Sequence, residues 1–123
     1  MFELTINGVV YQFSFNMGFM REINKTVTTT LDGTNTKKNI GLQYAVAGVI
    51  DGDMESLVQI LCAANKDGNP RVTQQLLDAY IDDENTNIDE LFDTVLNFLK
   101  RTNATKQTTI KLLEAVENQK QQN

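Results

Sequence analysis

The fold of this chain is decided by residues 2–24, which read Phe-Glu-Leu-Thr-Ile-Asn-Gly-Val-Val-Tyr-Gln-Phe-Ser-Phe-Asn-Met-Gly-Phe-Met-Arg-Glu-Ile-Asn. Asn7 and Gly8 separate two runs in which apolar and polar residues largely alternate. Both residues tolerate the positive φ angles that a two-residue type I′ turn requires, so this dipeptide predicts a β-hairpin. We therefore expect a hairpin over residues 2–15.

The turn also sets the register of the predicted hairpin. The expected pairs are Phe2 with Phe13, Leu4 with Tyr11 and Ile6 with Val9. These apolar side chains share one face, whereas the other face is mostly polar. Because a lone two-stranded hairpin is marginally stable, we expect a helix beginning at Asn16 or Met17 to cover the apolar face.

A two-stranded sheet has two edges, and each edge presents unpaired backbone groups. The sequence leaves two alternatives open. Either helices and loops of the same chain cover these edges, or an edge pairs with another copy or with a partner.

Composition indicates one compact soluble domain spanning residues 1–123, with a formal net charge of -5. A single cysteine excludes an intramolecular disulfide, and no charged segment followed by an apolar run opens the chain, so we expect a reducing cytoplasm. No apolar run approaches the roughly 20 residues that span a bilayer. The acidic balance disfavours a phosphate-binding surface, so neither a membrane nor nucleic acid is an expected partner.

The rest of the chain predicts helices. Apolar residues recur at helical spacing in segments beginning near Ile40, Asp53, Thr73, Asn87 and Asn103. Residues 26–39 are rich in Thr, Asn, Gly and Lys and predict a loop, for which a solvated connector is favoured over a binding loop. The fold class is therefore α+β: an N-terminal hairpin, then a mainly helical part over residues 16–118 with about five to six helices, and a polar tail over 117–123.

The residue types argue against an enzyme. The chain has no histidine and only one cysteine, Cys62, which we expect to be a small buried hydrophobe. This composition removes the usual zinc sets, Cys-His nucleophiles and Ser-His-Asp triads. Asp51, Asp53 and Glu55 lack the ligand spacing of a calcium loop, and the scattered glycines form no phosphate-binding motif. We expect no catalytic residues, no cofactor and no metal.

A family resemblance is carried by five stretches of the sequence. They are Leu4-Thr5-Ile6-Asn7-Gly8 with Tyr11, Phe13, Phe15, Gly18-Phe19 and Arg21-Glu22-Ile23-Asn24-Lys25; Gly41-Leu42-Gln43-Tyr44-Ala45-Val46-Ala47-Gly48; Ala63-Ala64-Asn65-Lys66; Leu77-Asp78-Ala79-Tyr80-Ile81-Asp82-Asp83; and Ile88-Asp89-Glu90-Leu91-Phe92. This pattern resembles the tail assembly chaperones of long-tailed, siphovirus-type phages and prophages of Gram-positive bacteria. The resemblance covers nearly the whole chain.

The resemblance implies a non-enzymatic chaperone in the host bacterial cytoplasm. Such a protein binds and solubilises the tape measure protein before the tail tube polymerises around it, and is absent from the mature virion. The resemblance also implies a longer, frameshifted form that recruits tail tube subunits. A tape measure protein exposes apolar helical surface, so its chaperone needs apolar grooves.

For partner contacts we single out four apolar residues near a predicted rim: Met17, Phe19 and Met20 by the hairpin, and Tyr44 on the small-residue helix. Methionine adapts to varied surfaces, although residues of these types at helical spacing more often belong to the core. The alternative function is a structural tail or connector subunit that remains in the virion and assembles through its hairpin edge. Self-association is compatible with either function.

Overall fold

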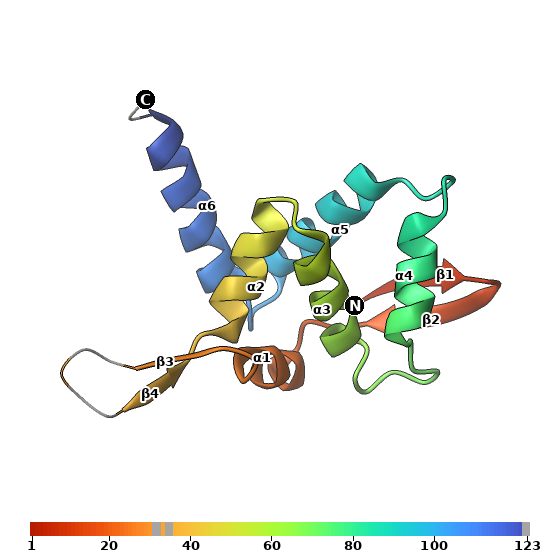
Figure 1. The fold of residues 1–123 in the computed structure, drawn as a ribbon, viewed down its shortest axis with the longest axis horizontal. Coiled ribbons are helices and arrows are strands. Elements are labelled where there is room, and N and C mark those ends of the chain that lie inside the picture. The colour runs from red at the N-terminus through yellow and green to blue at the C-terminus, as the bar shows by residue number, and fades with distance from the viewer. Residues whose placement is uncertain (31–32, 34–35, 122–123) are drawn as a thin grey trace.

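The computed structural model describes residues 1–30, 33 and 36–121. In this part of the chain an N-terminal antiparallel hairpin is followed by six helices and by a second, short hairpin between the first two of them. Figure 1 shows the two hairpins at opposite ends of the long axis, with most of the helices between them. The predicted α+β class, with its N-terminal hairpin and helical remainder, is confirmed.

The first hairpin consists of β1 (Phe2–Ile6) and β2 (Val9–Phe13). Its pairs are Phe2 with Phe13, Leu4 with Tyr11 and Ile6 with Val9, so the predicted register is confirmed. The turn residues have the positive φ angles that the sequence predicts, 54° at Asn7 and 79° at Gly8. Four of the six inward side chains are buried, whereas Leu4 is half-buried and Val9, beside the turn, is exposed.

Residues of more than one helix pack against the apolar face of the first hairpin. Helix α1 (Met17–Asn24) begins where the sequence predicts, because the Asn16 side chain accepts a hydrogen bond from the Phe19 amide at 2.9 Å. Phe15 lies 4.8 Å from the Phe19 ring and 5.7 Å from the Phe2 ring, measured between centroids. Phe98, from a later helix, lies 5.0 Å from Phe2. A continuous aromatic cluster therefore joins the hairpin to two helices.

The predicted loop over residues 26–39 is wrong in part. It contains strands β3 (Thr28–Thr30) and β4 (Lys37–Asn39), which pair antiparallel. The ladder continues one step inward, where the Ile40 amide donates to the Val27 carbonyl at 2.8 Å. Threonine favours extended backbone, but all three residues of β3 are exposed. The sequence of this segment therefore shows no alternation of apolar and polar residues that would predict a strand. Residues 31–32 and 34–35 of this predicted loop lie outside the described residues.

The next four helices are α2 (Gly41–Ile50), α3 (Met54–Ala64), α4 (Gln74–Asp82) and α5 (Ile88–Arg101). The predicted starts of the last three are confirmed, since the side chains of Asp53, Thr73 and Asn87 each accept a hydrogen bond from an amide three residues on. Gly52, with φ 80°, makes the sharp link between α2 and α3.

Helix α6 (Lys106–Gln121) begins later than the sequence predicts. Asn103 does not cap it, because residues 102–105 form a turn in which the Thr102 carbonyl accepts from the Thr105 and Lys106 amides. The buried Thr105 hydroxyl donates to the Leu99 carbonyl at 2.7 Å and ties this turn to α5. The predicted polar tail is helical as far as Gln121, and residues 122–123 lie outside the described part.

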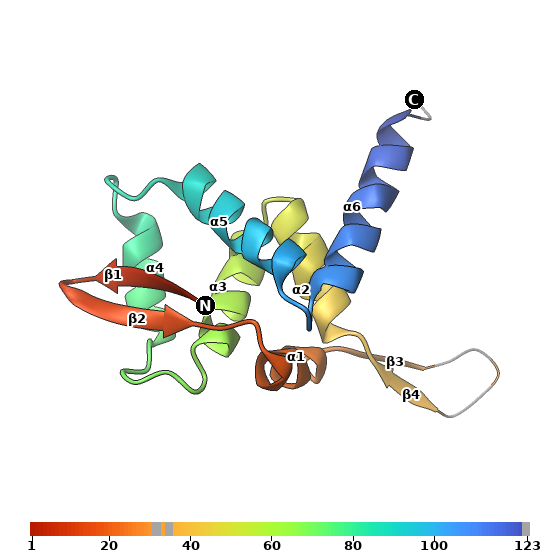
Figure 2. The same cartoon turned by 180° about the vertical axis from the view of Figure 1, so that it is seen from behind.

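The core is centred on α3, in which Leu57, Ile60 and Leu61 are completely buried. Helix α2 packs beside α3 and α1, and α6 leads away from the body beyond α2, as both ribbon views show (Figures 1 and 2). No helix among the described residues is both long enough and apolar enough to span a bilayer.

Candidate partner-binding surface

The structure separates the four residues predicted to contact a partner. Tyr44 is 62% exposed and Met17 is 45% exposed. Met20 is half-buried and packs against the core. Phe19 is fully buried in the aromatic cluster. Phe19 is therefore withdrawn as a contact residue, because its helical spacing reflects core packing rather than a rim.

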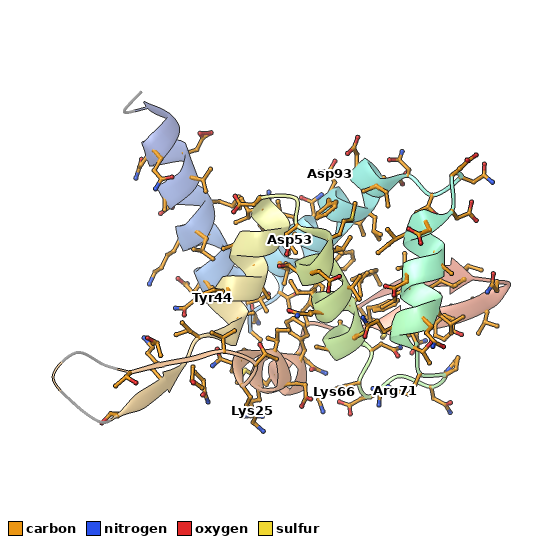
Figure 3. The ribbon with its side chains drawn as sticks, in the orientation of Figure 1. Lys25, Tyr44, Asp53, Lys66, Arg71 and Asp93 are labelled. Atoms are coloured by element: carbon orange, nitrogen blue, oxygen red, sulfur yellow. The ribbon has the colours of Figure 1, made fainter. Side chains whose placement is uncertain are left out.

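The exposed members of this set come from different elements. Met17 opens α1, whereas Tyr44 lies on α2 beside the start of α6 (Figure 3). The exposure of Tyr44 indicates a candidate binding surface at the α2–α6 pair. The sequence did not predict this surface.

Helices α2 and α6 contact each other, and both ribbon views show them diverging from neighbouring N-terminal ends (Figures 1 and 2). Side chains of the two helices line a shallow groove. We call this the α2–α6 groove, and its volume is about 240 Å³. It is lined by Ala47, Ile50, Asp51, Leu112, Ala115, Val116 and Gln119. Five of these seven side chains are apolar, so the groove is suited to an apolar ridge from another chain.

The apolar side chains of α6 are only partly used by the core. Leu112 packs against it, and two threonines are buried here, Thr109 in α6 and Thr105 in the turn before it. Ile110, Leu113 and Val116 form a thin apolar stripe at helical spacing, yet Ile110 is 42% exposed and Leu113 is half-buried. The sequence signal that could have revealed this surface is the offset of Leu112 from that stripe, which gives α6 two apolar sides.

Two observations on the ionisable groups concern thiol reactivity and metal binding. Cys62 is half-buried, and burial raises the pKa of its thiol, with the Asp78 charge adding to the rise and Arg71 opposing it. A raised pKa keeps the thiol protonated and unreactive near neutral pH. Among the described residues, no group of three His, Cys, Asp or Glu side chains could hold a metal ion.

The two edges of the first hairpin have different environments. At the β2 edge, the Asn65 side chain donates to the Gln12 carbonyl at 2.8 Å, and the Ser14 amide donates to the Ala64 carbonyl at 2.9 Å. The end of α3 thus covers β2. In the described part of the chain, β1 pairs with β2 alone, so its outer edge has no neighbouring strand.

Comparison with known proteins adds a family to this geometry. The family model described as "Phage tail assembly chaperone protein, TAC" matches residues 3–114. The match runs from β1 into α6 and includes all of α2, but it ends before three of the α6 groove residues, Ala115, Val116 and Gln119. Searches of curated proteins and of solved structures returned no match.

Proposed function

The chain belongs to the phage tail assembly chaperone family, and from this membership we propose that it binds and solubilises the tape measure protein during tail assembly. In this proposal the α2–α6 groove receives one face of an amphipathic helix of the tape measure protein. Tyr44 extends the contact at the rim, and the role is non-enzymatic.

The observation that carries this proposal is the apolar lining of a groove between two helices. A long helical protein that has not yet been enclosed exposes an apolar stripe, and such stripes bind in grooves with spaced apolar contacts. The partial exposure of Leu112 and Val116 in the groove supports the same role, because apolar groups left uncovered in a monomer mark interaction surfaces. A shallow groove also favours release when the tail tube replaces the chaperone.

The net charge of -5 is consistent with this role. Like charges keep chaperone complexes apart in solution and disfavour binding to nucleic acid. We propose accordingly that the protein acts in the cytoplasm of its host, is absent from the mature virion, and exists also as a frameshifted longer form that recruits tail tube subunits.

The proposal is tested by co-expressing the tagged chain with the large coiled-coil-like protein encoded downstream. We expect a soluble complex that forms only when both proteins are present. If the partner stays insoluble and unbound while the tagged chain is folded by circular dichroism, the chaperone function is wrong for this pair.

The groove itself is tested by a matched pair of substitutions. Val116→Glu places a charge in the α2–α6 groove and should reduce recovery of the complex about tenfold, the effect of roughly 1.4 kcal/mol. Val10→Glu places the same charge on the exposed outer face of the first hairpin and should leave recovery unchanged. Equal recovery with both variants, each folded by circular dichroism, would assign the contact to another surface.

The open edge of β1 favours one alternative function, that of a tail or connector subunit that stays in the particle and assembles through the hairpin. Mass spectrometry of purified virions separates the two. A chaperone should be missing, whereas a structural subunit should be present at fixed copy number.

A further inference from the structure

A second groove, distinct from the α2–α6 groove, runs along β1. We call it the β1 groove, and its volume is about 490 Å³. Its lining comes from residues 4–7 on one side, and from residues at the end of α4, in the following loop and in the first half of α5 on the other. Figure 2 shows β1 as the strand of the hairpin that faces α5. The groove therefore follows the edge of the sheet that has no neighbouring strand.

The register identifies which backbone groups point into this open side. In a hairpin with a two-residue turn, the residues that flank the turn form a hydrogen-bonded pair, and the pairs alternate from there. Ile6, Leu4 and Phe2 thus bond to β2, whereas the amides and carbonyls of Thr5 and Glu3 point outward. The same alternation turns Gln12 outward on β2, where its carbonyl accepts from Asn65.

The β1 groove is acidic. Two carboxylates, Asp83 and Glu90, belong to its described lining, and no lysine or arginine does. Glu3 adds a third exposed carboxylate on the edge strand itself. The Asp83 carboxylate accepts from the Asn85 amide at 2.9 Å, which holds the charge at the rim. A cationic side chain placed here gains from the two lining charges, Asp83 and Glu90.

We propose that the β1 groove binds an extended segment of a partner protein that contains lysine or arginine and that adds to β1 as a third strand. The outward amides and carbonyls of Glu3 and Thr5 supply the ladder, the partner's cationic side chains meet Asp83 and Glu90, and its alternate side chains lie against the half-buried Leu4 and Tyr80. This contact shares no element with the α2–α6 groove. It is therefore independent of the tape measure proposal and can fail separately.

The full chain is titrated with a fluorescein-labelled peptide of sequence Thr-Lys-Val-Lys-Val-Lys-Thr, blocked at both ends. We expect saturable binding by fluorescence anisotropy, and amide chemical-shift changes confined to residues 3–7 and 79–94. Two control peptides should not bind: one with alternate backbone nitrogens methylated, which blocks a ladder, and one with glutamate in place of lysine. Affinity should fall as salt rises, because the charges are exposed.

Two kinds of substitution test the ladder and the charge separately. Thr5→Pro removes an outward amide without touching the bonds to β2, and should weaken the peptide about fivefold to tenfold. Thr5→Val keeps the amide and should bind as the native chain does. Glu90→Lys reverses one rim charge and should weaken peptide binding by about threefold or more at low salt. Because the Glu90 side chain is exposed, this variant should fold and remains a test of the proposal if Thr5→Pro does not fold.

Three results would overturn the proposal. One is equal affinity of the native chain and both weakened variants. Another is a set of shift changes that lies away from β1 and α5. The third is failure of the peptide to bind while Thr5→Pro converts an oligomer of the native chain to a monomer, since the edge would then be occupied by a second copy.

Discussion

Replacing Asn65 with alanine should destabilise the fold more than the same replacement at any exposed asparagine. This side chain is completely buried at the end of α3. Its Nδ2 donates to the Gln12 carbonyl at 2.8 Å and, with a longer bond of 3.4 Å, to the Pro70 carbonyl. Its Oδ1 accepts from the buried Val72 amide. One amide group thus joins the first hairpin, α3 and the segment that leads into α4.

The magnitude follows from the partners that alanine would leave unpaired. A buried Val72 amide without an acceptor costs about 1–3 kcal/mol, and loss of the bond to Gln12 about 0.5–1.5 kcal/mol. The bond to Pro70 is too long to add much. We therefore expect Asn65→Ala to lower the free energy of unfolding by about 2–4 kcal/mol, a large part of the roughly 5–15 kcal/mol of a typical domain. The midpoint of thermal unfolding should fall by roughly 6–20 °C.

The assay is urea unfolding followed by circular dichroism, with hydrogen exchange of the Val72 amide as a local readout. Asn97→Ala is the control, because that side chain is exposed on α5 and should change stability by at most about 0.5 kcal/mol. If Asn65→Ala unfolds at the same urea concentration as Asn97→Ala, Asn65 does not join these segments in the way described.

Three further outcomes are expected. Gly41→Ala should destabilise the fold by about 1–3 kcal/mol in urea unfolding, although alanine favours helices, because its Cβ would overlap the Ile23 carbonyl. An unchanged or higher urea midpoint would contradict this close approach. Phe19→Ala should cost about 3–5 kcal/mol in the same assay, whereas a contact residue at a rim would cost little. The Ser56 hydroxyl holds the pKa of Asp53 below its ordinary value of 3.8. The stability from this cap is therefore complete above pH 3.8 and is lost as the pH falls through the lower pKa of the folded state. Thermal unfolding of the native chain and of Asp53→Asn from pH 2 to 6 should show a difference in midpoint above pH 4 that disappears in acid.

Local sequence was sufficient wherever one short-range rule governs a feature. The Asn7-Gly8 turn set the register of β1 and β2, because the backbone angles of two residues propagate along the ladder. Caps at Asp53, Thr73 and Asn87 were equally predictable, since each depends on an amide three residues away.

Features that depend on distant segments were not predictable. Strands β3 and β4 carry no apolar alternation, so only their pairing reveals them. Asn103 has the right chemistry for a cap, but the bond from Thr105 to the Leu99 carbonyl fixes a different turn and moves the start of α6. Phe19 and Tyr44 look alike as apolar residues of predicted helices, and only the packing buries one and exposes the other.

The sequence by itself determined the α+β class, the register of the first hairpin, most helix starts and the resemblance that the family match confirms, because turn chemistry, helical spacing and short motifs act over a few residues. The tertiary structure alone decided which surfaces are open. It covered the β2 edge with Asn65, left the β1 edge free beside Glu90, and placed Leu112 and Val116 in a groove against α2. Exposure is set by what segments far apart in the chain bury together, and no local pattern encodes that.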